Sequence, residues 1–219
     1  MSKYYFLLIG SLIIVFNSFS QQLTVKVLDT DFSKGRLTHQ QSICLDDAAK
    51  FHGHLCDGLA VGFLGLREAA YKLYPDSIID RTNTRVVSKS SPCITDIGIY
   101  LSGGRYQYNT FYASDSIQYL YIVQRIDNSK AYGVKLKPGI KPAAIDSLGN
   151  IAATGKLDAC NIKQLKELEI AFLQKLLTLN PSLIYVVDEI KGFEWKSSLI
   201  NLFIKSDIIN KHLPECSKP

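Results

Sequence analysis

The spacing of apolar and polar residues changes several times along the chain, and each change predicts a different kind of element. Alternating apolar and polar positions, and β-rich runs bounded by turn formers, predict strands, whereas apolar residues that recur every three or four positions predict helices. Strands are expected at 23–28, 84–88, 106–113, 117–125, 130–136 and 183–187. Helices are expected at 45–51, 58–74, 92–102, 142–148 and 162–179, and again in the region that contains Trp195 and 199–209.

The order of these elements predicts the fold class. Short polar segments at 114–116 and 127–129 separate the three central strands, and turn formers between β-branched and aromatic runs favour hairpins. The sequence therefore predicts an α+β fold, with an antiparallel sheet packed against helices, in a single domain at 21–219. Within that domain, a C-terminal helical extension is expected at about 160–219.

Residues 1–20 have the layout of a secretory signal peptide. Lys3 precedes an apolar run at 4–16, and small and polar residues follow at 17–20. The apolar run is shorter than the roughly 20 residues that cross a membrane, and an uncleaved anchor is the alternative. We expect cleavage near Ser20, no stable membrane span afterwards, and a periplasmic or secreted protein.

Charge and cysteine content narrow the classes of function. The formal net charge is +5 and the basic residues are scattered, so nucleic-acid binding is not expected. All five cysteines follow the expected cleavage site, and an oxidising compartment favours disulfides. Cys44, Cys160 and Cys216 are expected to supply one structural disulfide and one buried thiol.

The densest group of metal-ligand residue types lies at 51–58, where His52, His54 and Cys56 fall within five residues. If this stretch is extended, the three side chains share one face, because side chains alternate along a strand. If it is helical, His52 and Cys56 lie one turn apart and His54 points elsewhere. Gly53 and Gly58 favour the extended arrangement, because glycine tends to interrupt helices.

A second candidate group begins the helix expected at 92–102. Ser91 is suited to cap that helix and Pro92 to occupy its first position, which places Cys93 in the first turn. The positive end of the helix dipole lowers the pKa of a thiol there and favours the thiolate, the form that binds metals. Asp96 follows one turn later on the same face.

Together the two groups contain two imidazoles and two thiols. This donor set suits zinc or another divalent transition metal. The sequence therefore predicts a metal site made of His52, His54, Cys56 and Cys93. The alternative is a disulfide between Cys56 and Cys93, with the histidines packed nearby.

Both segments resemble the signature of a formylmethanofuran dehydrogenase family, that of the FHGHxCPG-type metal-binding domains. The stretch at 51–58 is similar to the FHGHxCPG motif itself, and the stretch at 91–103 is similar to the family's C-x-x-D-A-x-x-x-x-T-G segment. The resemblance extends over roughly 45–137. It implies an α+β core with an antiparallel sheet, a homodimer, and a metal site that usually holds zinc.

The resemblance also implies roles for single residues. Carried over by position, it makes His54, Cys56 and Cys93 the ligands, with His52 a further ligand or the hydrogen-bond partner of one. Asp96 would then support a ligand or act as a base.

Asp57 stands where the family has proline, which changes the family's substrate contacts but none of its ligands. Two classes of function fit these features. The first is an exported metal-binding protein, an accessory or cofactor-handling factor. The alternative is a metal-dependent enzyme that acts on a small substrate through a metal-bound water, with Asp96 as a possible catalytic residue. The chain has no GxSxG, P-loop, GxGxxG or HExxH motif, which favours the first class. Both classes admit a small-molecule ligand.

Overall fold

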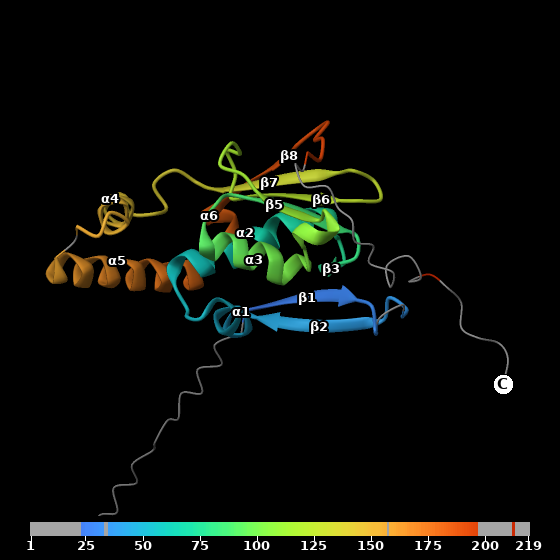
Figure 1. Ribbon diagram of the computed structural model, residues 1–219, viewed down its shortest axis with the longest axis horizontal. Coiled ribbons are helices and arrows are strands. Elements are labelled where there is room, and N and C mark those ends of the chain that lie inside the picture. Colours follow the sequence, from blue (N-terminus) through green and yellow to red (C-terminus); the bar gives the residue numbers. More distant parts are fainter. Residues whose placement is uncertain (1–22, 33–34, 157, 197–211, 213–219) are drawn as a thin grey trace, which may run out of the picture.

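A computed structural model describes residues 23–32, 35–156, 158–196 and 212. The described part has three layers, in which a central pair of helices lies between a small sheet and a larger one (Figure 1). The two sheets and the central helices share one core cluster of buried side chains. The signal peptide expected at 1–20, the helix expected at 199–209 and Cys216 lie outside the described residues.

The smaller sheet has three strands in the order β2-β1-β3: β1 (Thr24–Asp29), β2 (His39–Cys44) and β3 (Ile78–Asp80). β1 pairs antiparallel with β2 and parallel with β3. The sequence predicted β1 but assigned β2 to a polar loop, which is wrong. Only the last two residues of β2 are buried, so its sequence lacks the alternation that marks a strand. Pairing with β1 holds it extended.

The larger sheet has five strands in the order β5-β4-β6-β7-β8. They are β4 (Thr84–Ser88), β5 (Phe111–Ala113), β6 (Tyr121–Arg125), β7 (Ala131–Leu136) and β8 (Tyr185–Glu189). Its pairs are antiparallel except β4 with β5, which is parallel. The predicted α+β class is confirmed.

The predicted three-stranded meander is only half right. β6 and β7 form the expected hairpin, but β5 pairs with β4 and not with β6. The residues before β5 form a short 3-10 helix, η1 (Tyr106–Tyr108), that ends at Asn109 with a left-handed φ of 53°. This turn sends β5 along β4. Alternation along a strand does not specify which strand becomes its neighbour.

Three helices position the candidate site: α1 (Leu45–His52), α2 (Asp57–Leu73) and α3 (Pro92–Ser102). Twelve of the 17 residues of α2 are buried, which confirms the prediction of a buried, central helix. Its glycines permit close packing: a Cβ on Gly62 would lie 2.7 Å from the Tyr121 hydroxyl.

The C-terminal region adds α4 (Ala143–Ala152), α5 (Ala159–Thr178) and α6 (Pro181–Ile184) before β8 joins the larger sheet. The N-terminal half of α5 extends away from the layers, beside α4 (Figure 1). Trp195, expected in a helix, lies in a loop where its ring meets Tyr112. Among the described residues, no helix is long and apolar enough to cross a membrane.

Candidate metal centre

The stretch at 51–58 is neither wholly extended nor wholly helical. His52 is the last residue of α1, and Gly53 ends that helix with a left-handed φ of 108°. Cys56 is the N-cap of α2, in an extended conformation. The extended arrangement that placed three side chains on one face is therefore wrong. A helix end, a short loop and a helix start bring His52 and Cys56 together instead.

Cys93 enters the same place from α3. Ser91 is the N-cap of that helix and Pro92 its first residue, as predicted. Tyr121, which is fully buried, reaches from β6 and donates a hydrogen bond to the Ile94 carbonyl over 2.7 Å. This bond ties the first turn of α3 to the larger sheet. Sequence reasoning placed Tyr121 in the core without seeing this role.

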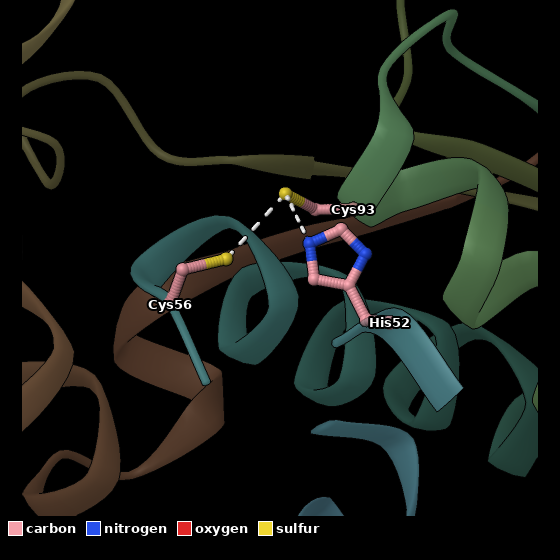
Figure 2. Close-up of side chains that lie close together, drawn as sticks. All are labelled: His52, Cys56 and Cys93. Atoms are coloured by element: carbon pink, nitrogen blue, oxygen red, sulfur yellow. Dashed lines mark hydrogen bonds between the residues drawn. The ribbon is translucent and has the colours of Figure 1, made fainter. Parts of the chain in front are cut away.

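Figure 2 shows how the three side chains converge. The Sγ atoms of Cys56 and Cys93 lie 3.5 Å apart, and the Sγ of Cys93 lies 3.6 Å from Nε2 of His52. All three candidate ligand atoms lie within 4.8 Å of one another, and all three residues are partly buried. Among the described residues this is the group of histidine, cysteine and acidic side chains that is close enough to hold a metal ion.

These distances fit a tetrahedral metal. Bonds of about 2.3 Å to sulfur and about 2.0 Å to nitrogen, at tetrahedral angles, separate two sulfurs by about 3.8 Å and sulfur from nitrogen by about 3.5 Å. The two printed contacts of Cys93 are within a few tenths of an ångström of these values. One imidazole and two thiols are also the donor types that zinc and similar metals prefer.

Asp96 completes the geometry. Its Oδ2 lies 2.8 Å from Nδ1 of His52, whose side chain is only 7% exposed. A proton on Nδ1 can be donated to this carboxylate, which leaves the lone pair of Nε2 directed towards Cys93. A carboxylate that orients a ligating histidine in this way is a usual feature of protein metal sites. Asp96, predicted from the sequence to support a ligand or act as a base, lies where it can do the first.

The sequence model of one family, described as FmdE, Molybdenum formylmethanofuran dehydrogenase operon, matches residues 51–186. The match includes every side chain of the converging group and most of the larger sheet. The chain belongs to the FmdE family. The match also extends beyond the 45–137 range inferred from motifs, as far as β8. A comparison with curated proteins found no match.

In this FmdE-family chain, His54 stands apart from the other three predicted ligands. It is exposed in the loop between α1 and α2, and it is not a member of the group whose ligand atoms converge among the described residues. Its ring centroid lies 4.8 Å from that of His52, with the planes tilted by 43°. His54 is therefore a neighbour of the FmdE-family site, placed at its solvent side.

The two thiols of the site do not share the same pKa. A hydrogen bond from the Cys93 thiol lowers the pKa of Cys56 to about 6, and the backbone N–H of Leu59 adds to the effect over 3.3 Å. The same contact and burial raise the pKa of Cys93. The expectation that the helix start lowers the pKa of Cys93 is therefore wrong for the pair without a metal. Two sulfurs at 3.5 Å retain one proton between them until a cation replaces it.

Gly58 is a further residue on which the site depends. A Cβ there would lie 3.0 Å from the Sγ of Cys93 and 3.2 Å from its Cβ. Only glycine lets α3 bring Cys93 this close to the start of α2. The FmdE-family motif contains this glycine, and its role becomes visible only when the two helices are packed.

Proposed function

We propose that this protein is an exported zinc-binding member of the FmdE family with an accessory or cofactor-handling role. His52, Cys56 and Cys93 would hold the metal, and Asp96 would orient His52. His54 would be the fourth ligand or would leave its place to an exchangeable one. The family membership and the converging side chains support metal binding; zinc, export and the role are the proposal.

The observation that supports this function best is the convergence of three donors from three helix ends. Nε2 of His52 and the two sulfurs come together although they belong to separate elements. A packing role alone would not require an imidazole turned towards a thiol pair by a carboxylate. Zinc suits the set because it accepts nitrogen and sulfur in a tetrahedron.

The test is the metal content of the mature protein, purified without exposure to nickel resin. We expect close to one zinc per chain by elemental analysis, and a near-complete loss in Cys93→Ser. Cys160→Ser is the matched control, because Cys160 is an exposed free cysteine on α5. It should retain the metal in full.

The contrary result is a protein without metal in which Cys56 and Cys93 resist thiol reagents until they are reduced. That would mean a disulfide and a structural or redox role. The two residues are free cysteines in the structure, but sulfurs at 3.5 Å need move little to form the bond of about 2.0 Å.

A metal-dependent enzyme is the second candidate, and the number of converging donors favours it. Three protein ligands leave one position of a tetrahedron for a substrate, whereas structural sites use four. A metal there would supply Lewis-acid chemistry. Asp96 would be a positioning residue in this case, because it touches His52 and not the open side.

Export and oligomeric state are separate parts of the proposal. The layout of 1–20 supports cleavage and a periplasmic or secreted location, which amino-terminal sequencing of the native protein tests. The resemblance to the family supports a homodimer. Sedimentation analysis of the mature chain would give the monomer mass if that part is wrong.

A further inference from the structure

A cavity of about 270 Å³ lies between the start of α2 and the helix α5. Cys56 is part of its lining, so the cavity adjoins the candidate metal centre. Its other lining includes four ionisable side chains, those of His54, Asp57, Lys166 and Glu169. The volume is slightly below that of ordinary ligand pockets, which suits a small molecule.

The charges in this cavity are not neutralised by the protein. None of the four takes part in an ion pair with another described residue. Neighbouring charges on the same two helices do form pairs, Lys141 with Asp146 and Lys163 with Glu167. A buried charge that has no partner is costly unless something supplies one.

Burial decides which of these charges selects the ligand. Asp57 is 8% exposed and Glu169 is partly buried, whereas Lys166 and His54 are exposed and remain solvated. Asp57 is held by the first turn of α2, where only backbone N–H groups of Gly58 and Asp57 itself approach its carboxylate. The desolvated charges of the cavity are therefore carboxylates, and a cation would complement them.

The remaining wall is aliphatic. Leu173 and Ile170, one turn apart on α5, face the same cavity, and Ile170 is 45% exposed. A bare metal ion would gain nothing from this wall, but the carbon chain of an organic cation would lose unfavourable contact with water. The two walls together describe a molecule with a charged nitrogen and a short apolar body.

We infer that this cavity binds a small alkylammonium ligand, with its nitrogen between Asp57 and Glu169 and its carbon chain along Ile170 and Leu173. Bound there, the ligand lies against Cys56 and so beside the metal centre. Asp57 stands where the family motif has proline, so this binding site is a property of this chain. The inference goes beyond the proposed function, because neither carboxylate is among the three converging metal donors.

The test is an NMR shift titration of the full mature protein with n-butylammonium, methylammonium and n-butyrate. Butylammonium should bind saturably, at least about tenfold more tightly than methylammonium, because three additional methylenes are buried. Butyrate has a similar chain but the opposite charge, and it should not bind at the cavity. Tighter binding of butyrate than of butylammonium would overturn the inference.

Three substitutions separate the two walls. Asp57→Asn and Glu169→Gln should each weaken butylammonium binding by at least about tenfold, the loss expected when one side of a desolvated charge pair is removed. Ile170→Ala should reduce the preference for butylammonium and leave methylammonium unchanged. Glu167→Gln is the control, since Glu167 is on the same helix but is paired with Lys163, and it should bind as the wild type does.

Wild-type affinity in both carboxylate variants would overturn the inference, and Glu169→Gln decides the matter if Asp57→Asn does not fold. Zinc content, measured in the same samples, reports separately on the proposed function. Butylammonium binding by a protein that holds no zinc would support the cavity and contradict the metal centre. A zinc-loaded protein that binds no amine would do the reverse.

Discussion

The starts of α1 and α2 are built alike and behave differently. Each helix has a cysteine as its N-cap, Cys44 with φ −97° and ψ 167° and Cys56 with φ −136° and ψ 169°. The carboxylate of Asp47 accepts hydrogen bonds from both the backbone N–H and the thiol of Cys44, each at 3.0 Å. The thiol of Cys56 faces a second thiol, from Cys93, and His52.

The difference shows what converts a capping cysteine into a candidate ligand. At α1 the cap is a local contact between residues three apart, and it lowers the pKa of Asp47. At α2 the partner is 37 residues away and is delivered by another helix. The same residue type in the same backbone position is therefore structural in one place and chemical in the other.

The largest expected effect comes from exchanging each cap for serine. Cys56→Ser should reduce zinc affinity by more than the roughly 10–100-fold seen when a hydrogen-bond partner of a ligand is lost, because a ligand itself is removed. Cys44→Ser should leave zinc affinity unchanged, since serine also caps a helix. Competition with a chromogenic chelator measures both. Equal effects would remove the distinction between the two caps.

A second comparison exchanges the carboxylates that support the two sites. Asp96→Asn should weaken zinc binding by about 10–100-fold, because His52 is then no longer held with Nε2 free. Asp47→Asn should keep zinc and destabilise the fold by about 1 kcal/mol through a weaker cap. Chelator competition and urea denaturation of both variants separate these outcomes. Loss of zinc in Asp47→Asn would contradict the assignment.

Gly58→Ala tests whether helix packing forms the pair of thiols. The added Cβ would displace Cys93, so zinc affinity should fall by about tenfold, a partial misplacement of one ligand. Gly149→Ala is the control, because a Cβ at that position in α4 meets nothing within 4 Å. That variant should gain about 0.5–1 kcal/mol of stability and keep its zinc. A Gly58→Ala protein with full affinity would show that α3 can shift freely.

The smallest effect is a shift of a titration in metal-free protein. Alkylation of Cys56 should rise with pH around a midpoint near 6, since the thiolate reacts and the hydrogen bond from Cys93 lowers its pKa. Cys93→Ala removes that donor and should move the midpoint upward. Peptide mass spectrometry after short exposure to iodoacetamide follows the single site. A midpoint near the ordinary thiol value of about 8.5 in both proteins would contradict the shared proton.

Local patterns were enough for much of the fold. The helices α1, α2, α3 and α5 and the strands β1, β4, β6, β7 and β8 occur where periodicity predicts them, within a few residues. The start of α3 was also predictable, because Ser91 and Pro92 are strong local signals. Strands β2 and β3 were not, since β2 is mostly polar and β3 has only three residues.

The sequence by itself determined which residue types were available for a metal site and which segments contained them. It named His52, Cys56, Cys93 and Asp96 from composition, spacing and family motif. These properties are local: a helix start is encoded by its capping residue and its first turn.

Only the tertiary structure decided how those residues meet. It placed His52 beside two thiols and Asp96, left His54 on the solvent side, and gave the shared proton to the pair. It also gave Gly58 its role and opened a cavity beside Asp57. The physical reason is that these properties depend on the packing of α3 and α5 against α2. Contacts between residues distant in the chain are set by the whole core, and no local spacing records them.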